Sequence, residues 1–312
     1  MNVFKDKNLL EEAAAIKNIN AVFVEKDWYA VQVLKKVREF SYPGFDIIFS
    51  GGTALSKAHG VIQRFSEDVD FRVQTNLLDG KSKSQQRKLL SDFKNALVTH
   101  LRTQFTIDDD KVMAWDGNHF FSIELDYPTL YAQSEVLRPH LLIEFKLSVL
   151  MLDAQVFSVS SFINELSQKS PEVRDIGCTN SIEIAVDKFS ALLWRIPQRE
   201  EDIKNGVENP DDRNMVRHLH DLYFLYEAAV GHSDFRSLAL RTIQEDDSRA
   251  KSISGLSVKE KFGIVLDILK NDRKYPAEYD HFVKGMSYAA GSLPEYRDAI
   301  AVFKQLYTYV LG

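Results

Sequence analysis

The sequence has very little cysteine, since Cys178 is the only one among 312 residues. A single thiol excludes an intramolecular disulfide and a zinc site built from several cysteines, so we expect Cys178 to be a small core residue. The chain also lacks an apolar run of the roughly 20 residues that a membrane-spanning helix needs, and its first residues lack the apolar stretch of a signal peptide. These absences predict a cytoplasmic protein without a membrane partner.

A surplus of basic charge is also missing. The formal net charge is −6, which argues against broad, charge-driven binding of nucleic acid over the whole surface. A local basic patch remains open, because several basic residues lie close together between positions 195 and 217, although acidic residues interrupt them. The hydrophobic fraction of 45% is ample for a sizeable core and for one or two domains.

The apolar pattern predicts an α+β fold, with an α/β domain over residues 1–180 and an all-helical domain over 181–312. Pro197, the polar stretch 198–211 and Pro210 are expected to separate the first two helices of the second domain. We expect strands at 47–49, 68–71, 119–126 and 140–150, and helices at 25–40, 83–105, 182–196, 212–230, 234–246, 257–271, 276–290 and 293–310.

A pair of glycines follows the first predicted strand. Gly51 and Gly52 allow the backbone to approach a triphosphate without interference from a Cβ atom. Thr53 can cap the helix that follows, and Ser56 and Lys57 add a hydroxyl and a charge one turn later. The spacing differs from that of a P-loop. Alone, a pair of glycines is a weak signal of phosphate binding.

Two carboxylates follow on the next predicted strand. Asp68 and Asp70 are two residues apart, so both point to the same face of that strand. Two such groups repel each other unless a cation lies between them, which predicts a site for Mg²⁺ or Mn²⁺ shared with substrate phosphates. An Asp-x-Asp pair alone is usually solvated surface, but here it follows the glycine turn by one short helix.

At this point the sequence resembles a known family, the AbiEii/AbiGii toxins, which are nucleotidyltransferases of the DNA polymerase β-like superfamily. The resemblance is carried by Gly-Gly-Thr-Ala-Leu-Ser-Lys at 51–57 and Arg-Phe-Ser-Glu-Asp-Val-Asp at 64–70. Shorter matches are Glu-Lys-Asp-Trp-Tyr at 25–29, Asp-Lys-Phe-Ser-Ala-Leu at 187–192 and Arg-His-Leu-His-Asp-Leu-Tyr at 217–223.

The resemblance implies that residues 1–180 form a polymerase β-like nucleotidyltransferase domain with a mixed sheet and that the helical domain over 181–312 completes the NTP cleft. It also implies further site residues. Polymerase β-like enzymes place a third acid on a neighbouring strand, and Glu144 matches it as a metal ligand or general base; the alternative is an edge-strand acid that faces solvent and pairs with Lys146. Lys188 is implied to contact the NTP triphosphate, and Asp221 to orient Lys188 or a metal-bound water. His218 receives no firm role.

Ser66 has two interpretations. Its hydroxyl either ends the preceding helix and bonds to the turn, or it lies beside the metal-bound phosphates of the NTP. In the second case, phosphorylation of Ser66 would place a dianion next to Asp68 and Asp70 and block the enzyme.

By resemblance, the chain is expected to be the enzyme toxin of a toxin–antitoxin or abortive-infection pair, with an antitoxin partner. It would transfer NMP from an NTP, bound between the two domains, to RNA, with the tRNA 3′ end as the leading candidate and pyrophosphate as the second product. Two alternatives remain: a transferase that modifies a protein or a small molecule such as an antibiotic, and a protein that binds NTP without catalysis.

Overall fold

The computed structural model describes residues 4–131, 137–138, 140–207, 213–289 and 291–312. Internal contacts divide the chain into two compact units. Unit 1 consists of Met1–Gly60 and Phe65–Thr179, and unit 2 of Val61–Arg64 and Asn180–Gly312. Residues Val61–Arg64 thus belong to unit 2, although the chain on both sides of them belongs to unit 1. They lie shortly before the strand that contains Asp68 and Asp70.

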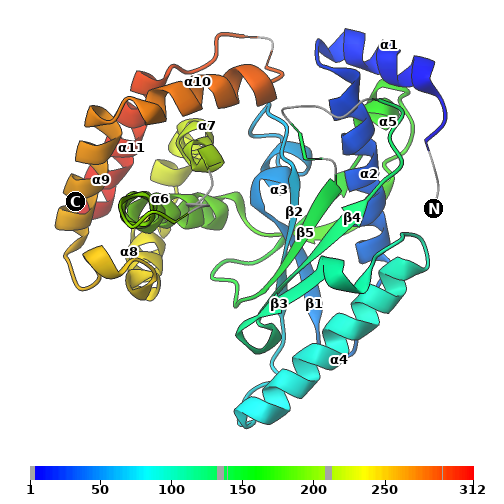
Figure 1. The fold of residues 1–312 in the computed structure, drawn as a ribbon, viewed down its shortest axis with the longest axis horizontal. Coiled ribbons are helices and arrows are strands. Elements are labelled where there is room, and N and C mark those ends of the chain that lie inside the picture. Colours follow the sequence, from blue (N-terminus) through cyan, green and yellow to red (C-terminus); the bar gives the residue numbers. More distant parts are fainter. Residues whose placement is uncertain (1–3, 132–136, 139, 208–212, 290) are drawn as a thin grey trace. The chain divides into compact units, whose positions relative to one another are not determined.

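Unit 1 is built on a mixed seven-stranded sheet with the strand order β3-β4-β5-β2-β1-β7-β6 (Figure 1). The β2–β5 and β1–β7 pairs are parallel, and the other neighbouring strands are antiparallel. This sheet confirms the predicted α+β class. The strands are β1 (Asp46–Ser50), β2 (Asp68–Gln74), β3 (Val112–Trp115), β4 (Phe120–Asp126), β5 (His140–Leu147), β6 (Gln155–Val159) and β7 (Val173–Cys178).

A stack of aromatic rings fills one face of the central strands. Phe145 of β5 stacks on Phe71 of β2 and on Phe121 of β4, with ring centroids 5.0 and 4.7 Å apart. All three side chains are buried. Because successive side chains of a strand alternate between the faces, the neighbours of these phenylalanines point to the opposite face. The aromatic core thus determines where the polar residues of β2 and β5 lie.

Helices cover the sheet within unit 1. The longest, α4, begins with a capping box between Ser82 and Gln85 and buries Phe93, Leu97 and Leu101. The ring centroid of Phe93 lies 4.5 Å from that of Phe45, in a stacked arrangement, and 6.4 Å from that of Phe121 on β4, so this helix packs against the sheet. The helices are α1 (Lys7–Lys17), α2 (Ala21–Arg38), α3 (Gly51–Lys57), α4 (Lys83–Arg102) and α5 (Phe162–Leu166).

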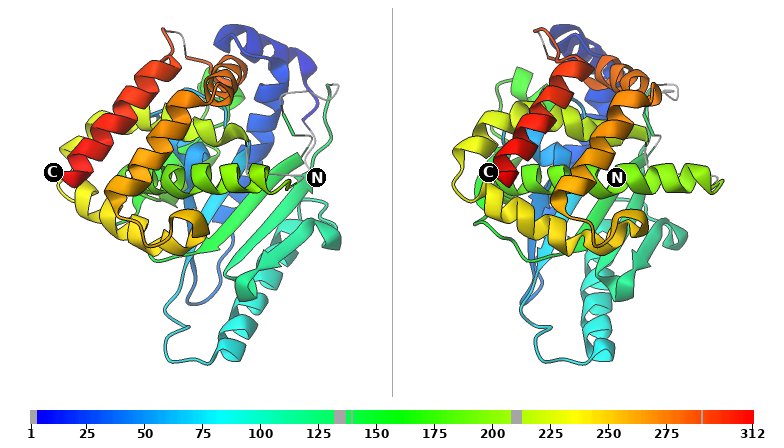
Figure 2. Two further views of the ribbon diagram at one scale, coloured as in Figure 1. Left: turned by 60° about the vertical axis from the view of Figure 1, so that its left-hand side comes forward. Right: turned by 90° about the vertical axis from the view of Figure 1, so that its left-hand side faces the viewer.

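The described helices of unit 2 lie between Ser181 and Leu311 and are coloured from green to red in Figure 2, whereas Val61–Arg64 is a non-helical segment with an isolated bridge from Arg64 to Ser287. The prediction that Pro197 ends its first helix is wrong. Pro197 lies buried inside α6, which continues to Lys204 because buried side chains on either side keep it packed after the loss of one backbone hydrogen bond. Pro210 lies outside the described residues. The helices are α6 (Ser181–Lys204), α7 (Arg217–Gly231), α8 (Phe235–Glu245), α9 (Val258–Asn271), α10 (Lys274–Met286) and α11 (Tyr296–Leu311).

The single cysteine lies where the sequence predicts it. Cys178 is fully buried at the end of β7, and burial raises the pKa of its thiol to about 12. None of the described helices is both long and apolar enough to cross a bilayer.

Candidate active site

Three carboxylates lie on the face of the sheet opposite the aromatic stack. Asp68 and Asp70 occupy alternate positions of β2, and Asp70 is directly opposite Glu144 in the parallel register with β5. Asp68 is buried, while Asp70 and Glu144 are half-buried. The alternative that Glu144 is an edge-strand acid is wrong, because β5 lies between β4 and β2 in the interior of the sheet. The register thus brings the three predicted acids to one face.

The glycine turn lies directly beneath one of these acids. Gly51 has a φ of +72°, and a Cβ atom built on it would lie 1.8 Å from Oδ2 of Asp70. Only glycine permits both this backbone conformation and this close approach. The hydroxyl of Thr53 donates a hydrogen bond to the backbone carbonyl of Asp68, so α3 is tied to the acidic strand.

The predicted capping role of Thr53 is wrong. The helix α3 begins at Gly51, with Ser50 as its N-cap residue, so Thr53 lies inside the first turn and its hydroxyl reaches across to β2. The sequence placed the start too late because it treated both glycines as loop. Ser56, one turn further on, donates its hydroxyl to the Thr53 carbonyl at 3.4 Å.

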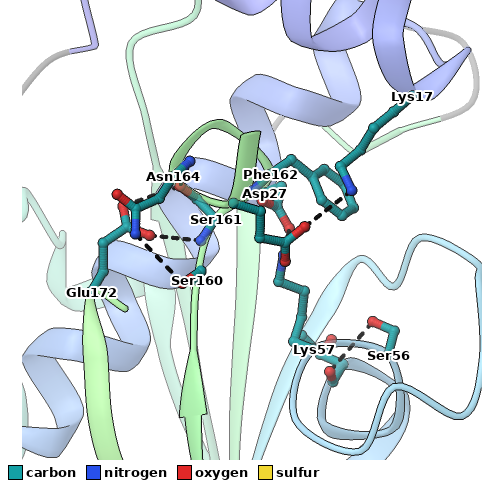
Figure 3. A network of polar contacts seen from close by, with 11 residues as sticks. Lys17, Asp27, Ser56, Lys57, Ser160, Ser161, Phe162, Asn164 and Glu172 are labelled. Carbon is teal, nitrogen blue, oxygen red and sulfur yellow. Dashed lines mark hydrogen bonds and ion pairs between the residues drawn. The ribbon is translucent and has the colours of Figure 1, made fainter. Parts of the chain in front are cut away.

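Lys57 belongs to a buried ionic network within unit 1 (Figure 3). Its ammonium lies 2.9 Å from Oδ1 of Asp27 on α2 and 4.0 Å from the ring centroid of Phe162 on α5. Both ion-pair side chains are only 4% exposed. Burial raises the pKa of Asp27, whereas Lys57 and the backbone N–H of Phe162 act to lower it. These contacts describe a lysine that joins three helices, with its charge matched inside unit 1.

Ser66 lies in the segment between α3 and β2 and is half-buried. It does not end the preceding helix, as one interpretation held, because α3 ends at Lys57. Its position two residues before Asp68 is compatible with the second interpretation.

The donor set of the acidic face fits a hard divalent cation. All three groups are carboxylates, and oxygen ligands of this kind suit Mg²⁺ and Mn²⁺. The Asp70 carboxylate also lies in a space over Gly51 that a Cβ atom would fill. Within the described ranges, however, no three acidic, histidine or cysteine side chains are gathered closely enough to form a metal cluster as they stand. A cationic side chain also contacts one of the three acids, since Nη1 of Arg138 lies 3.1 Å from Oδ1 of Asp68.

In unit 2, Asp221 on α7 binds two cationic side chains at once. Arg64 donates from Nε and Nη2 to its two carboxylate oxygens, each at 2.6 Å, and Lys188 of α6 lies 2.7 Å from Oδ2. All three side chains are buried. Burial acts to raise the pKa of Asp221, but Arg64 and Lys188 hold it well below the ordinary value.

His218 on α7 is a buried histidine close to several cationic side chains. Burial and the nearby cations Lys188, Arg195 and Arg217 hold the pKa of His218 well below its ordinary value, so its imidazole is neutral at pH 7. The same burial lowers the pKa of Lys188, which Asp221 opposes.

The sequence analysis missed two arginines. Arg64 stands inside the matched motif at 64–70, so its place there was a usable signal, whereas Arg138 stands in no motif. The ion-pair partners of these arginines could not be predicted from the sequence, because Arg64 and Asp221 are 157 positions apart and Arg138 and Asp68 are 70 positions apart.

Comparison with known proteins identifies the family of the chain. The sequence profile of the family described as "Nucleotidyl transferase AbiEii toxin, Type IV TA system" matches residues 33–302. A search of curated protein sequences found no match.

Among solved structures, the chain is similar to MenT4, a nucleotidyltransferase toxin from Mycobacterium tuberculosis, with a TM-score of 0.54 and 13% identity over 97% of this chain and 89% of that one. It also matches JHP933 from Helicobacter pylori (TM-score 0.40, 13% identity, 99% and 95% covered) and a putative nucleotidyltransferase from H. pylori (TM-score 0.42, 14%, 92% and 95%). The family match covers most of the sequence, and the chain belongs to the AbiEii family of nucleotidyltransferase toxins of type IV toxin–antitoxin systems.

Proposed function

We propose that this nucleotidyltransferase transfers NMP from an NTP to an acceptor hydroxyl and releases pyrophosphate. The acceptor oxygen bonds to the α-phosphorus, the bond from that phosphorus to the bridging oxygen of the β-phosphate breaks, and the hydroxyl proton passes to a base. The observation that carries the proposal is the in-register pair of Asp70 and Glu144, with Asp70 over Gly51.

In this proposal Asp68, Asp70 and Glu144 would hold Mg²⁺ or Mn²⁺. Such an ion, when bound, supplies a Lewis acid that eases deprotonation of the acceptor hydroxyl and neutralises phosphate charge. Glu144 has a second role open to it, as the base that accepts the hydroxyl proton, since it is half-buried and adjacent to Asp70.

The NTP is proposed to be bound by Lys188 together with the backbone at Gly51 and Gly52, with Ser66 nearby. The buried cluster of Arg64, Lys188 and Asp221 places two cationic side chains beside one carboxylate, which supports a role with an anionic ligand. Asp221 then orients Lys188 without touching the substrate. Arg64 precedes Asp68 by four positions, so the proposed residues of both units are joined by a short stretch of chain.

RNA is the proposed acceptor, with the tRNA 3′ end as the first to test. A toxin gains potency by acting on a molecule that every translating cell needs, and a terminal ribose supplies the required hydroxyl. The family description names a toxin–antitoxin system, so a cognate antitoxin is the proposed partner.

The test uses NTPs labelled either at the α- or at the γ-phosphate, incubated with the protein, Mg²⁺ and either total RNA or total protein. We expect α-label, and no γ-label, to enter the RNA fraction. Asp68→Asn is the matched inactive control. Label from the γ-position would indicate phosphoryl transfer instead, and α-label in the protein fraction alone would refute an RNA acceptor.

A further inference from the structure

Arg138 lies just before β5 and is held by two buried charged residues of unit 1. Its backbone N–H donates to Oε1 of Glu67 at 2.7 Å, and its carbonyl accepts from Nζ of Lys26 at 3.0 Å. Lys26 and Glu67 also pair with each other at 3.3 Å, with side chains 0% and 5% exposed. The backbone N–H and the backbone carbonyl of Arg138 are thus both hydrogen-bonded to one buried ion pair.

Such a pair is costly to bury and is retained only where its remaining hydrogen bonds are satisfied. Here those bonds go to the backbone of Arg138 on both sides. Lys26 belongs to α2 and Glu67 directly precedes β2, so Arg138 is anchored to α2 and to the start of the strand that carries Asp68 and Asp70. A surface arginine needs no anchoring of this kind.

The side chain of Arg138 reaches the acidic face. Its Nη1 lies 3.1 Å from Oδ1 of Asp68, and the Arg138 side chain is 38% exposed while that of Asp68 is 9% exposed. A guanidinium carries five N–H donors in a planar fork, and one bond to Asp68 leaves several of them for another ligand. The fork matches two oxygens of a phosphate group, which a lysine ammonium does not.

We propose that Arg138 is a triphosphate-binding residue of this active site, and that Lys26 and Glu67 are positioning residues that hold it there. The inference rests on the proposed nucleotidyl transfer. Without nucleotide, the guanidinium neutralises part of the charge on Asp68. With NTP bound, its donors turn to the β- and γ-phosphate oxygens, and Asp68 becomes available to a cation.

The first experiment measures equilibrium binding of each NTP and of the matching NMP to the whole protein. Arg138→Ala should weaken NTP binding about 10- to 100-fold, as expected for a lost charge-assisted hydrogen-bonding group, and leave NMP binding unchanged. Arg138→Lys should restore only part of the affinity. Arg102→Ala is the matched control, since it removes a comparable ion pair, Arg102 with Asp109 at 2.5 Å, on the exposed surface of the same unit.

The second experiment tests the positioning role by kinetics. Lys26→Met should raise the KM for NTP in the same direction as Arg138→Ala, and should have no further effect on KM when Arg138 is already alanine. If Lys26 had only a structural role, Lys26→Met would change the KM by the same factor with Arg138 present and with Arg138→Ala. Should Lys26→Met fail to fold, Glu67→Gln gives the same comparison with the backbone acceptor preserved.

The outcomes separate the inference from the function on which it rests. If the wild type transfers α-label and Arg138→Ala keeps its NTP affinity and KM, the inference is wrong and the function stands. If Arg138→Ala is more active than the wild type, Arg138 restrains Asp68 and does not bind substrate, which also overturns the inference. If the wild type transfers no label, NTP and NMP affinities still test Arg138 directly.

Discussion

Replacing Gly51 by alanine adds one methyl group at the start of α3. At a φ of +72° an alanine costs about 1–2 kcal/mol in backbone strain. The new Cβ would also lie 1.8 Å from Oδ2 and 2.8 Å from Cβ of Asp70, so the strand or the carboxylate must move. Overpacking of this kind costs a further 1–3 kcal/mol or so, for a total of about 2–5 kcal/mol.

Gly80→Ala provides a matched control for the strain alone. Gly80 has a φ of +71°, and a Cβ built there meets no atom within 4 Å. Urea unfolding should therefore show a loss of about 1–2 kcal/mol for Gly80→Ala and a distinctly larger loss for Gly51→Ala. Nucleotidyl transfer should fall about 100-fold or more only in Gly51→Ala, because a catalytic carboxylate displaced by ~1 Å loses its alignment.

A double mutant isolates the contact between Gly51 and Asp70. In an Asp70→Gly background the three clashing atoms are absent, so Gly51→Ala should cost no more than Gly80→Ala does. Equal costs of Gly51→Ala in both backgrounds, or an active Gly51→Ala enzyme, would refute the close approach of Asp70 to the turn.

Four further predictions concern single residues. Asp68→Asn and Asp70→Asn should each abolish transfer of α-label while the thermal midpoint without Mg²⁺ holds or rises, since carboxylate repulsion is relieved; a fully active variant would contradict the metal-site assignment. Lys188→Ala should raise the KM for NTP and Lys188→Arg should rescue it only partly; wild-type rates at low NTP would make this lysine structural. Lys57→Met should lower the unfolding free energy by about 3–5 kcal/mol with an unchanged KM, and a raised KM with normal stability would return Lys57 to the nucleotide site. His218 is neutral when folded, so the unfolded chain binds more protons below about pH 6.5 and stability should fall between pH 7 and 5; His218→Gln should flatten that slope.

The acidic face was predictable because its geometry is local. Residues two apart on a strand share a face, so Asp68 and Asp70 follow from the sequence alone once β2 is recognised. The pairing of Asp70 with Glu144 needs the parallel register of β2 and β5, which the alternation of buried phenylalanines with acids in both strands favours. Here one pattern determines both the core and the site.

Other features depend on contacts that no local pattern encodes. The short strands β3, β6 and β7 and the helices α1 and α5 were not foreseen, since their runs are brief and only partly apolar. Pro197 was expected to end a helix by its intrinsic preference, but burial on both sides overrides that preference. The contact of Arg138 with the acidic face could not be predicted either, because its partner Asp68 is 70 positions away in the sequence.

Charge balance separates the two lysines that the sequence assigned to the nucleotide. In unit 1, Lys17 and Lys57 face Asp27 and Glu165, with contacts of 3.0 Å for Lys17–Glu165 and 2.9 Å for Lys57–Asp27, so these four groups sum to zero (Figure 3). In unit 2, Lys188 shares the carboxylate of Asp221 with Arg64, so this carboxylate is divided between two cationic side chains. A lysine that shares its carboxylate partner with a second cation gains more from a further anion than a lysine in a balanced network. This difference favours Lys188 over Lys57 for the proposed contact with the triphosphate, whereas the contacts of Lys57 join α2, α3 and α5.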